Sequence, residues 1–303
     1  MKIGVVGLGK MGEAIAYRLL KGGHEVVVFD PNASAARRAK RFGVQTVKDL
    51  VDIAKNVRVI WIMVPAGKVV DDVLKKLRPY LKSGDIIIDG GNSNFKDTIR
   101  RSKALSKNKI HFLDCGTSGG LYGRKIGFSL MVGGDEKAFT KVKPIFKAIA
   151  APNGFGYIGP SGSGHYVKMV HNGIEYALLQ SYAEGFKLLK YGKYKNLDLE
   201  KISKVWMNGS VIRSWILDLI YNIFKKDQKF KNVSGEIGEN LTGYWTVQEA
   251  KEQKIPVDLI KQSLDIRAWS RKTGGDYATK LVSLMRNQFG GHPVKMIKEE
   301  KKK

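Results

Sequence analysis

The sequence predicts an α/β N-terminal domain with a doubly wound, mostly parallel sheet, followed by an all-α C-terminal domain. The first half alternates short, apolar, β-rich segments with longer amphipathic segments, which is the pattern of a parallel sheet covered by helices. After the glycine-rich stretch from Gly154 to Gly164 the β-rich segments stop. The rest of the sequence has the pattern of helices separated by glycine and proline.

Strands are expected at six places in the first half. Several of these segments are apolar at consecutive positions, as strands buried on both faces of a sheet should be. The expected strands are residues 2–6, 25–29, 57–63, 85–88, 110–113 and 128–132.

The chain carries a large positive charge. Its 53 lysine and arginine residues against 28 aspartate and glutamate residues give a formal charge of +25 at pH 7. Such a charge suits either a nucleic-acid partner or a polyanionic substrate. The basic residues are scattered, and the sequence has no zinc-finger spacing, aromatic RNA-binding signature or arginine-rich recognition helix, so we expect no nucleic-acid partner.

Composition also bears on location. No apolar run approaches the ~18 residues that a membrane span needs, so we expect no membrane partner. The single cysteine, Cys115, excludes a disulfide framework and a thiolate metal cluster within one chain, which agrees with a reducing compartment. We therefore expect a cytoplasmic protein.

A glycine-rich turn predicts a dinucleotide site of the Rossmann type. It follows the strand at residues 2–6 and opens a helical segment, where a G-x-G-x-x-G motif must lie to bind a pyrophosphate. Gly7 permits the tight turn, Gly9 lets the backbone approach the anion, and Gly12 allows close packing of helix on strand. The whole motif is Gly7, Leu8, Gly9, Lys10, Met11 and Gly12.

Asp30 favours NAD over NADP as the cofactor. It follows the second strand 18 positions after Gly12, near the offset at which a carboxylate binds the adenosine ribose. A carboxylate there repels the additional phosphate of NADP, although Arg37 and Arg38 on the next helix keep NADP possible. A turn at Val64, Pro65 and Ala66, after the third strand, is a second candidate cofactor contact or an ordinary turn.

A polar stripe on an apolar helix predicts the catalytic groups. The stripe spans about 100° of the helix at 100° per residue, while apolar side chains occupy the remaining surface. A lysine and a carboxylate buried so close together are costly unless they are paired or used, so the stripe is either catalytic or a structural ion pair. Its members are Lys168, His171, Asn172, Glu175 and Tyr176.

These residues lie in a long segment that closely resembles the signature of decarboxylating 6-phosphogluconate dehydrogenases, in the short form of that family. The segment is residues 162–176 (GSGHYVKMVHNGIEY). Four further segments strengthen the resemblance, so that it covers almost the whole chain: residues 89–93 (DGGNS), 118–120 (SGG), 208–215 (NGSVIRSW) and 286–292 (RNQFGGH).

The resemblance implies a reaction that needs no metal. Lys168 would take the proton of the 3-hydroxyl group as hydride leaves the adjacent carbon for the nicotinamide. Lys168 would then donate a proton to the carbonyl of the β-keto acid, so that loss of carbon dioxide gives an enediol. Glu175 would protonate the first carbon and release ribulose 5-phosphate.

The resemblance also implies the ligand contacts and a homodimer or homotetramer, in which the region of Arg286 and His292 completes the neighbouring site. The sugar acid would be held by Asn92, Ser118, Gly119, Gly120, His171 and Asn172, with Tyr176, Arg267, Arg286 and His292 near the phosphate. Asn92 would also contact the cofactor. The expected domains are residues 1–163 (dinucleotide binding), 164–292 (helical, substrate binding and dimerisation) and 293–303 (basic tail).

One position departs from the family. Tyr244 stands before Trp245 where the family usually has a lysine or arginine near the phosphate, and tyrosine carries no charge. This keeps open a related β-hydroxyacid dehydrogenase that acts on an unphosphorylated acid, although such a substrate would not need Arg286 and His292. A non-catalytic, basic nucleic-acid-binding protein of Rossmann type is a further alternative, which the stripe of Lys168 and Glu175 disfavours.

Overall fold

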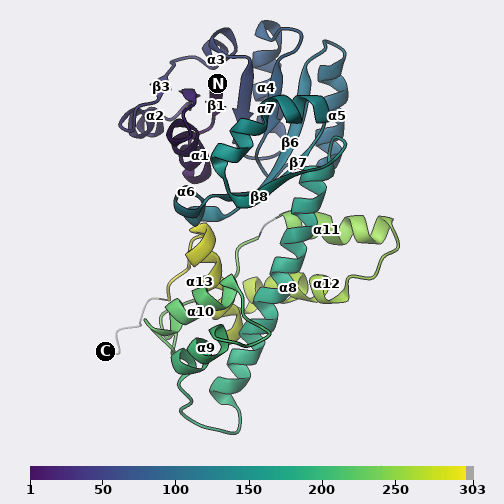
Figure 1. Cartoon of the computed structure of the whole chain (residues 1–303). Helices are drawn as coiled ribbons and strands as arrows, with labels where there is room; N and C mark the ends of the chain where they lie inside the picture. The colour runs from purple at the N-terminus through teal and green to yellow at the C-terminus, as the bar shows by residue number, and fades with distance from the viewer. Residues whose placement is uncertain (240, 298–303) are drawn as a thin grey trace. The chain divides into compact units, whose positions relative to one another are not determined.

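The computed structural model describes residues 1–239 and 241–297. The described chain separates into two compact units, Met1–Met169 and a second unit that begins at Val170. The last six residues of the basic tail expected at 293–303 lie outside the described residues. A single helix, α8 (Ser163–Tyr191), begins in the first unit and ends in the second (Figure 1).

The N-terminal unit alternates strands and helices. Its strands are β1 (Lys2–Val6), β2 (Glu25–Phe29), β3 (Gln45–Thr46), β4 (Val59–Ile62), β5 (Ile86–Asp89), β6 (His111–Ser118), β7 (Phe128–Gly133) and β8 (Ala150–Gly159). Its helices are α1 (Lys10–Lys21), α2 (Ala33–Lys40), α3 (Leu50–Asn56), α4 (Lys68–Leu77), α5 (Phe95–Ser106), α6 (Gly123–Ile126) and α7 (Glu136–Ile149), with short 3₁₀ turns at Arg78–Tyr80 and Gly120–Tyr122.

The strands form one sheet with the order β3-β2-β1-β4-β5-β6-β7-β8 in the described part of the chain. The β6–β7 pair is antiparallel and the other neighbours are parallel. The order reverses direction between β1 and β4, so the carboxyl ends of these two strands flank the crevice in which doubly wound sheets bind ligands. The fold class predicted from the sequence is confirmed.

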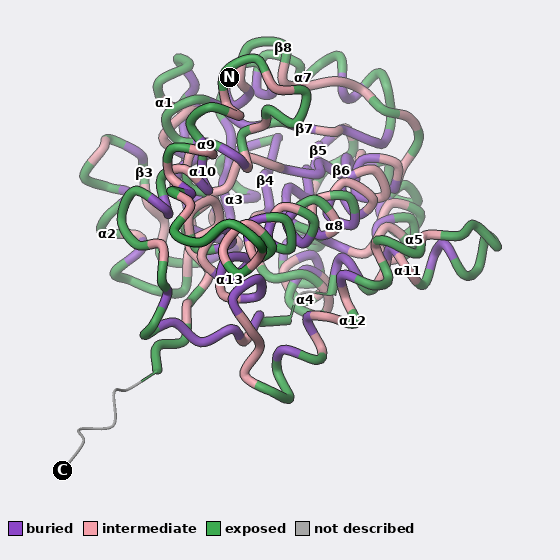
Figure 2. Tube along the Cα trace, turned by 90° about the horizontal axis from the view of Figure 1, so that it is seen from below, coloured by how far each residue is buried: buried purple, intermediate pink, exposed green. Residues whose placement is uncertain are grey.

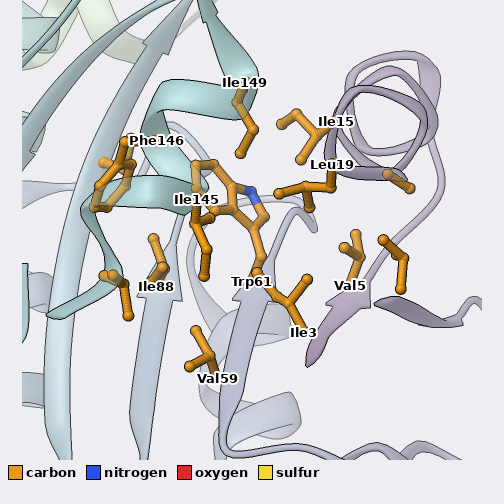
Figure 3. Close-up of a cluster of buried hydrophobic side chains, with 14 of the residues drawn as sticks. Ile3, Val5, Ile15, Leu19, Val59, Trp61, Ile88, Ile145, Phe146 and Ile149 are labelled. Atoms are coloured by element: carbon orange, nitrogen blue, oxygen red, sulfur yellow. The ribbon is translucent and has the colours of Figure 1, made fainter. Parts of the chain in front are cut away.

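Apolar side chains cover both faces of this sheet. One cluster joins α1, α2 and α7 to the strands, and a second joins α3, α4 and α5 to the opposite face. β4 and β5 are buried along their whole length (Figure 2). Trp61 lies at the centre of the first cluster, among Ile15, Ile145 and Phe146 (Figure 3).

Two strands were not predicted, and one is longer than predicted. β3 has only two residues, which is too short for a periodic signal. β8 contains Pro152 and several glycines, which weaken the sequence pattern of a strand. It is an edge strand with irregular pairing, where proline and glycine are tolerated. β6 continues to Ser118, five residues beyond the predicted end.

The second unit is helical. After α8 it contains α9 (Leu199–Met207), α10 (Trp215–Phe224), α11 (Leu241–Glu252), α12 (Asp258–Thr273) and α13 (Tyr277–Gly290). Its core joins α8, α10 and α13 through buried residues that include Phe186, Ile220 and Leu281. Across the described residues, the helices are all too short or too polar to cross a membrane.

Candidate active site

A cleft opens at the carboxyl ends of β1, β4, β5 and β6 in the N-terminal unit. It encloses about 280 Å³. Eight residues predicted to contact the cofactor lie in its lining, together with four that the sequence did not single out as site residues: Met63, Gly90, Gly91 and Thr117. The complete lining is Gly9, Lys10, Met11, Gly12, Met63, Val64, Pro65, Ala66, Gly90, Gly91, Asn92 and Thr117.

The glycine turn after β1 leaves backbone N–H groups available at the cleft. Gly7 has φ +94°, which favours glycine, and a Cβ on Gly12 would lie 2.0 Å from the Gly7 carbonyl oxygen. A Cβ on Gly9 would meet no atom within 4 Å in the described chain, so this backbone is open to a ligand. Within the described residues, no side chain caps α1 at Gly9, whereas Asn or Asp caps α2, α3, α5 and α7. The uncapped helix start suits an anion.

Asp30 stabilises the glycine turn through its backbone. Its carboxylate accepts hydrogen bonds from the backbone N–H groups of Leu8 at 2.6 Å and Asn32 at 2.7 Å. The Leu8 side chain is fully buried in the core, its N–H is bonded to Asp30, and Leu8 is not among the residues that line the cleft. Arg38, one of the two candidates for an NADP phosphate, forms an ion pair with Glu13 at 3.0 Å, and Arg37 is exposed.

Asn92 is exposed on a braced loop at the end of β5. The buried carboxylate of Asp89 accepts hydrogen bonds from the Ser93 hydroxyl at 2.7 Å and from the Gly91 N–H at 3.1 Å. These bonds hold the backbone on both sides of Asn92. The loop therefore presents the Asn92 amide from a fixed base.

Lys168 is 6% exposed and packs against the backbone of β6. A Cβ on Gly116 would lie 2.4 Å from the Lys168 Cβ, so only glycine there admits the lysine stem. Asp114, also buried, accepts hydrogen bonds from the N–H groups of Gly162 and His165 and so fixes the start of α8. The strand and the helix start together determine where the Lys168 side chain begins.

The predicted substrate residues Ser118, Gly119 and Gly120 lie at the end of β6, the strand against which Lys168 packs. Ser118 ends β6, and the chain then turns through positive φ angles at Gly119 (+134°) and Gly120 (+50°). All three residues are half-buried. The turn thus places consecutive backbone N–H groups at the carboxyl end of the strand, where ligands of such sheets bind.

In the helical unit, α11 orients two members of the polar stripe. The Asn172 side chain donates to the Thr242 hydroxyl at 3.0 Å, and the Tyr176 hydroxyl lies 3.5 Å from the same oxygen. A Cβ on Gly243 would collide with the Tyr176 ring at 2.4 Å. His171 Nδ1 lies 3.1 Å from the Asn172 amide oxygen. Thr242 was not predicted as a site residue, because an isolated threonine at a helix start carries no distinctive signal.

Two buried guanidinium groups lie near this stripe in the same unit. Arg267, 3% exposed, stacks on the Tyr176 ring at 3.4 Å, and its two terminal nitrogens have no hydrogen-bond partner among the described residues. Burial lowers the pKa of Arg267 to about 10. Burial also lowers the pKa of Arg286, while Tyr176 and Glu175 raise it. Buried donors without an acceptor indicate a place for an anion.

Three other residues discussed in the sequence analysis, Glu175, His292 and Tyr244, belong to the helical unit. Glu175 is half-buried and contributes to the electrostatic environment of both arginines. His292 is half-buried after α13, where its carbonyl accepts a hydrogen bond from Asn287. Tyr244 is 53% exposed, and its hydroxyl accepts a hydrogen bond from Gln248 at 2.6 Å.

The two kinds of surface on α8 differ in exposure. Lys168, Asn172 and Tyr176 of the polar stripe are buried. Of the apolar residues outside the stripe, Ile174 is 51% and Leu178 is 45% exposed in the single chain.

The chemistry available follows from these groups. The N-terminal unit combines an anion-binding helix start with a buried lysine, and the helical unit combines a carboxylate with two buried cations. The groups of the N-terminal unit suit a dinucleotide and proton transfer by a lysine, and those of the helical unit suit an anion and proton transfer by a carboxylate. Among the described residues, no group of three or more His, Cys, Asp or Glu side chains is placed to hold a metal ion.

Comparison with known proteins assigns the two parts of the chain separately. Residues 2–159 match the profile of the NAD binding domain of 6-phosphogluconate dehydrogenase, and residues 164–277 match its C-terminal domain. A Haloferax volcanii protein named NAD(+)-dependent, decarboxylating 6-phosphogluconate dehydrogenase is 48% identical, over 97% of this chain and 98% of its own length. A decarboxylating 6-phosphogluconate dehydrogenase of Staphylococcus aureus is 39% identical, and the match spans 60% of that longer protein.

Solved structures agree. A Plasmodium falciparum 6-phosphogluconate dehydrogenase superposes with a TM-score of 0.82 at 32% identity, covering 90% of this chain and 62% of that one. A 3-hydroxyisobutyrate dehydrogenase of Mycobacterium tuberculosis superposes with a TM-score of 0.74 over 95% of this chain and 98% of that one, but at 21% identity it shows the shared fold alone.

Proposed function

The chain belongs to the 6-phosphogluconate dehydrogenase family, and from that premise we propose that it oxidises and decarboxylates 6-phosphogluconate to ribulose 5-phosphate and carbon dioxide, with NAD as the preferred cofactor. The observation that carries the proposal is the pair of buried arginines, Arg267 and Arg286, beside the polar stripe. A phosphate supplies the negative charge and the acceptors that such donors require. An unphosphorylated acid does not, which disfavours the related β-hydroxyacid dehydrogenase.

Two residues of α8 would move the protons. Lys168, buried against Gly116, takes the proton of the substrate 3-hydroxyl and later returns a proton to the carbonyl oxygen formed there. Glu175, two turns further along the helix, protonates the first carbon of the enediol after carbon dioxide has left. The bound cofactor supplies the hydride acceptor.

The remaining candidate residues would hold the substrate. Asn92 and the turn at Ser118, Gly119 and Gly120 offer amide and hydroxyl groups to the sugar acid. His171 and Asn172, the latter oriented by Thr242, bind its hydroxyl groups. Tyr176, Arg267, Arg286 and His292 bind its phosphate. Tyr244 contributes no charge, and the buried pair of arginines supplies the charge that this position usually adds.

The NAD preference rests on the charges around Asp30. Its carboxylate is fixed by Leu8 and Asn32 at the end of β2, and an added phosphate on the adenosine ribose would meet this negative charge. Arg38 is paired with Glu13, which leaves it less able to bind such a phosphate. The cleft fits a dinucleotide because the uncapped start of α1 and the open backbone at Gly9 face it.

We also propose a cytoplasmic homo-oligomer. The single cysteine is buried, in keeping with a reducing compartment. The resemblance implies that the segment from Arg286 to His292 completes the neighbouring site. In this chain Arg286 is buried within its own helical unit, where Tyr176 and Glu175 influence its charge. We propose that the segment from Arg286 to His292 serves the neighbouring site in the oligomer, as the resemblance implies.

The test of the proposed function is formation of reduced cofactor, followed by absorbance. The purified protein is given 6-phosphogluconate with NAD or with NADP, and gluconate and 3-hydroxyisobutyrate serve as controls. We expect rapid reduction of NAD with 6-phosphogluconate alone. Reduction with only an unphosphorylated acid would contradict the proposed substrate, and faster reduction of NADP would contradict the role of Asp30.

A further inference from the structure

Arg101 is a buried cation in the N-terminal unit that the proposed chemistry does not use. It lies on α5, and its side chain is 1% exposed. Its guanidinium donates to both carboxylate oxygens of Asp71, at 2.9 and 3.2 Å, and to the Gly67 carbonyl at 2.9 Å. It also donates to the Ser93 hydroxyl at 3.3 Å and lies 3.7 Å from the Asp89 carboxylate.

These bonds reach two separate walls of the cleft. Gly67 ends the turn that begins with Val64, Pro65 and Ala66. Ser93 and Asp89 hold the loop that carries Gly91 and Asn92. One side chain therefore connects the turn after β4 to the loop after β5.

The strand order indicates which half of the dinucleotide lies next to these two walls of the cleft. A doubly wound sheet binds the two mononucleotide halves of its ligand on opposite sides of the point where the strand order reverses. Asp30, at the end of β2, marks the adenosine side. β4 and β5 lie on the other side of β1, so their turns face the nicotinamide half.

Resting on the proposed dinucleotide, we propose that Arg101 is a positioning residue for the nicotinamide half of the cofactor, acting through the turn at Gly67 and the loop at Asn92. A planar guanidinium donates in several fixed directions at once, which this arrangement requires. An ammonium group at the same place keeps the positive charge but does not reach all of these acceptors.

Two arginines pair with the Asp71 carboxylate. Arg101 holds the pKa of Asp71 down to about 2, so this carboxylate stays ionised at neutral pH. Arg100 also pairs with Asp71, at 3.0 Å, but its side chain is 57% exposed, and its hydrogen bonds go to the carboxylates of Asp71 and Asp97 and not to Gly67 or Ser93. Arg100 is therefore a matched control, since it shares the partner and the charge without the bracing contacts.

The experiment compares Arg101→Lys with Arg100→Lys in the full chain. Dissociation constants are measured for NADH and for ADP-ribose, which lacks the nicotinamide ring, in the absence of substrate. We expect Arg101→Lys to weaken NADH binding about tenfold, as loss of charge-assisted hydrogen bonds does, and to change ADP-ribose binding less than about twofold. Arg100→Lys should leave both constants within about twofold of the wild type.

Equal weakening of the two ligands by Arg101→Lys would overturn the proposal, since it would indicate general damage to the domain. An unchanged NADH constant would overturn it as well. If Arg101→Lys does not fold, Ser93→Ala removes one of the bracing contacts and should weaken NADH more than ADP-ribose; equal effects would again contradict the proposal. Failure of the proposed function is distinct, because it would appear as no binding of NADH to the wild type or no turnover of 6-phosphogluconate.

Discussion

The two units offer positive charge to ligands by different means. In the N-terminal unit the proposed anion site is the uncapped start of α1, where the backbone at Gly9 is open. In the helical unit the proposed anion site is formed by the guanidinium groups of Arg267 and Arg286, which are buried near Tyr176. The first site depends on the absence of side chains, and the second depends on two particular ones.

This difference has energetic consequences. Backbone dipoles at a helix start exist in any folded helix, so a site built from them adds little cost to folding. Two neighbouring buried cations are costly to fold, and Glu175 offsets this cost only in part, so a bound anion should stabilise the unit further. We therefore expect substitutions in the two sites to separate stability from binding in opposite ways, and the predictions below test that expectation.

The largest effect is expected at Lys168, the one buried side-chain cation that the proposal places in the N-terminal part of the site. Lys168→Met should lower kcat roughly a thousandfold or more, because proton transfer at the 3-hydroxyl loses its base. Binding of NADH should stay near the wild-type value, since the cleft lining does not include Lys168. Steady-state turnover and NADH titration measure the two quantities; turnover near the wild-type rate would refute the assigned base.

Arg267→Met should have the next largest effect. The KM for 6-phosphogluconate should rise about a hundredfold, because a charge-assisted contact to phosphate is lost. The same variant should raise the free energy of unfolding by about 1 to 2 kcal/mol in the absence of ligand, because it removes the desolvation cost of a buried charge that Tyr176 and Glu175 offset only in part.

Arg271→Met is the control for Arg267→Met. It lies one turn further along α12, is partly exposed, and pairs with Glu239 and the Ile237 carbonyl. Its effect on KM should be small. Chemical denaturation measures the free energy of unfolding of both variants, and steady-state kinetics measures their KM. A lower free energy of unfolding in Arg267→Met would contradict the prediction, because it would show that the buried guanidinium stabilises the fold without a ligand.

Substitutions in the glycine turn should not raise the free energy of unfolding, in contrast to Arg267→Met. Gly9→Ala should leave the free energy of unfolding nearly unchanged, because its Cβ meets no described atom within 4 Å, but it should weaken NADH binding about tenfold. Gly12→Ala should lower stability by about 2 to 3 kcal/mol, since its Cβ would lie 2.0 Å from a backbone oxygen. Equal behaviour of the two variants in denaturation and titration would contradict the division of roles.

The smallest effect is expected at His24, which belongs to neither proposed site and should change stability without changing ligand binding. Burial lowers the pKa of His24 below its ordinary value of 6.5. Below pH 6.5 the unfolded chain therefore takes up a proton that the folded chain resists, and stability falls as the pH decreases. His24→Gln should flatten this dependence by less than about 1 kcal/mol between roughly pH 6.5 and 5. A profile as steep as that of the wild type, in denaturation at each pH, would count against His24.

The sequence predicted those parts of the candidate site that follow from local rules, and it missed those that depend on contacts between distant segments. Gly9, Lys10 and Asp30 follow from local rules, because a strand, a turn and a helix in sequence order build the anion site. Gly90, Gly91 and Thr117 were missed as site residues, since their place in the cleft depends on which strands become neighbours. Likewise Thr242 reaches Asn172 across 70 residues, a distance that periodicity does not span.

The fold shows the same division between local and distant information. The buried parallel strands have a strong apolar signal, whereas β8 at the edge of the sheet has a weak one, because most of its residues are half-buried or exposed. The stripe on α8 was found by its helical spacing. The residues that contact it were not, because spacing gives the angle between side chains and says nothing of what packs against them.

The contact between Trp61 and Gly90 limits the order in which this cleft can change over evolution. Gly90 lines the cleft, and a Cβ on it would lie 2.3 Å from the indole nitrogen of the fully buried Trp61. A descendant that gains a side chain at position 90 must first accept a smaller residue at position 61, and that step empties the centre of a core. The two positions are thus bound to change as a pair, and the first step of the pair is the costly one.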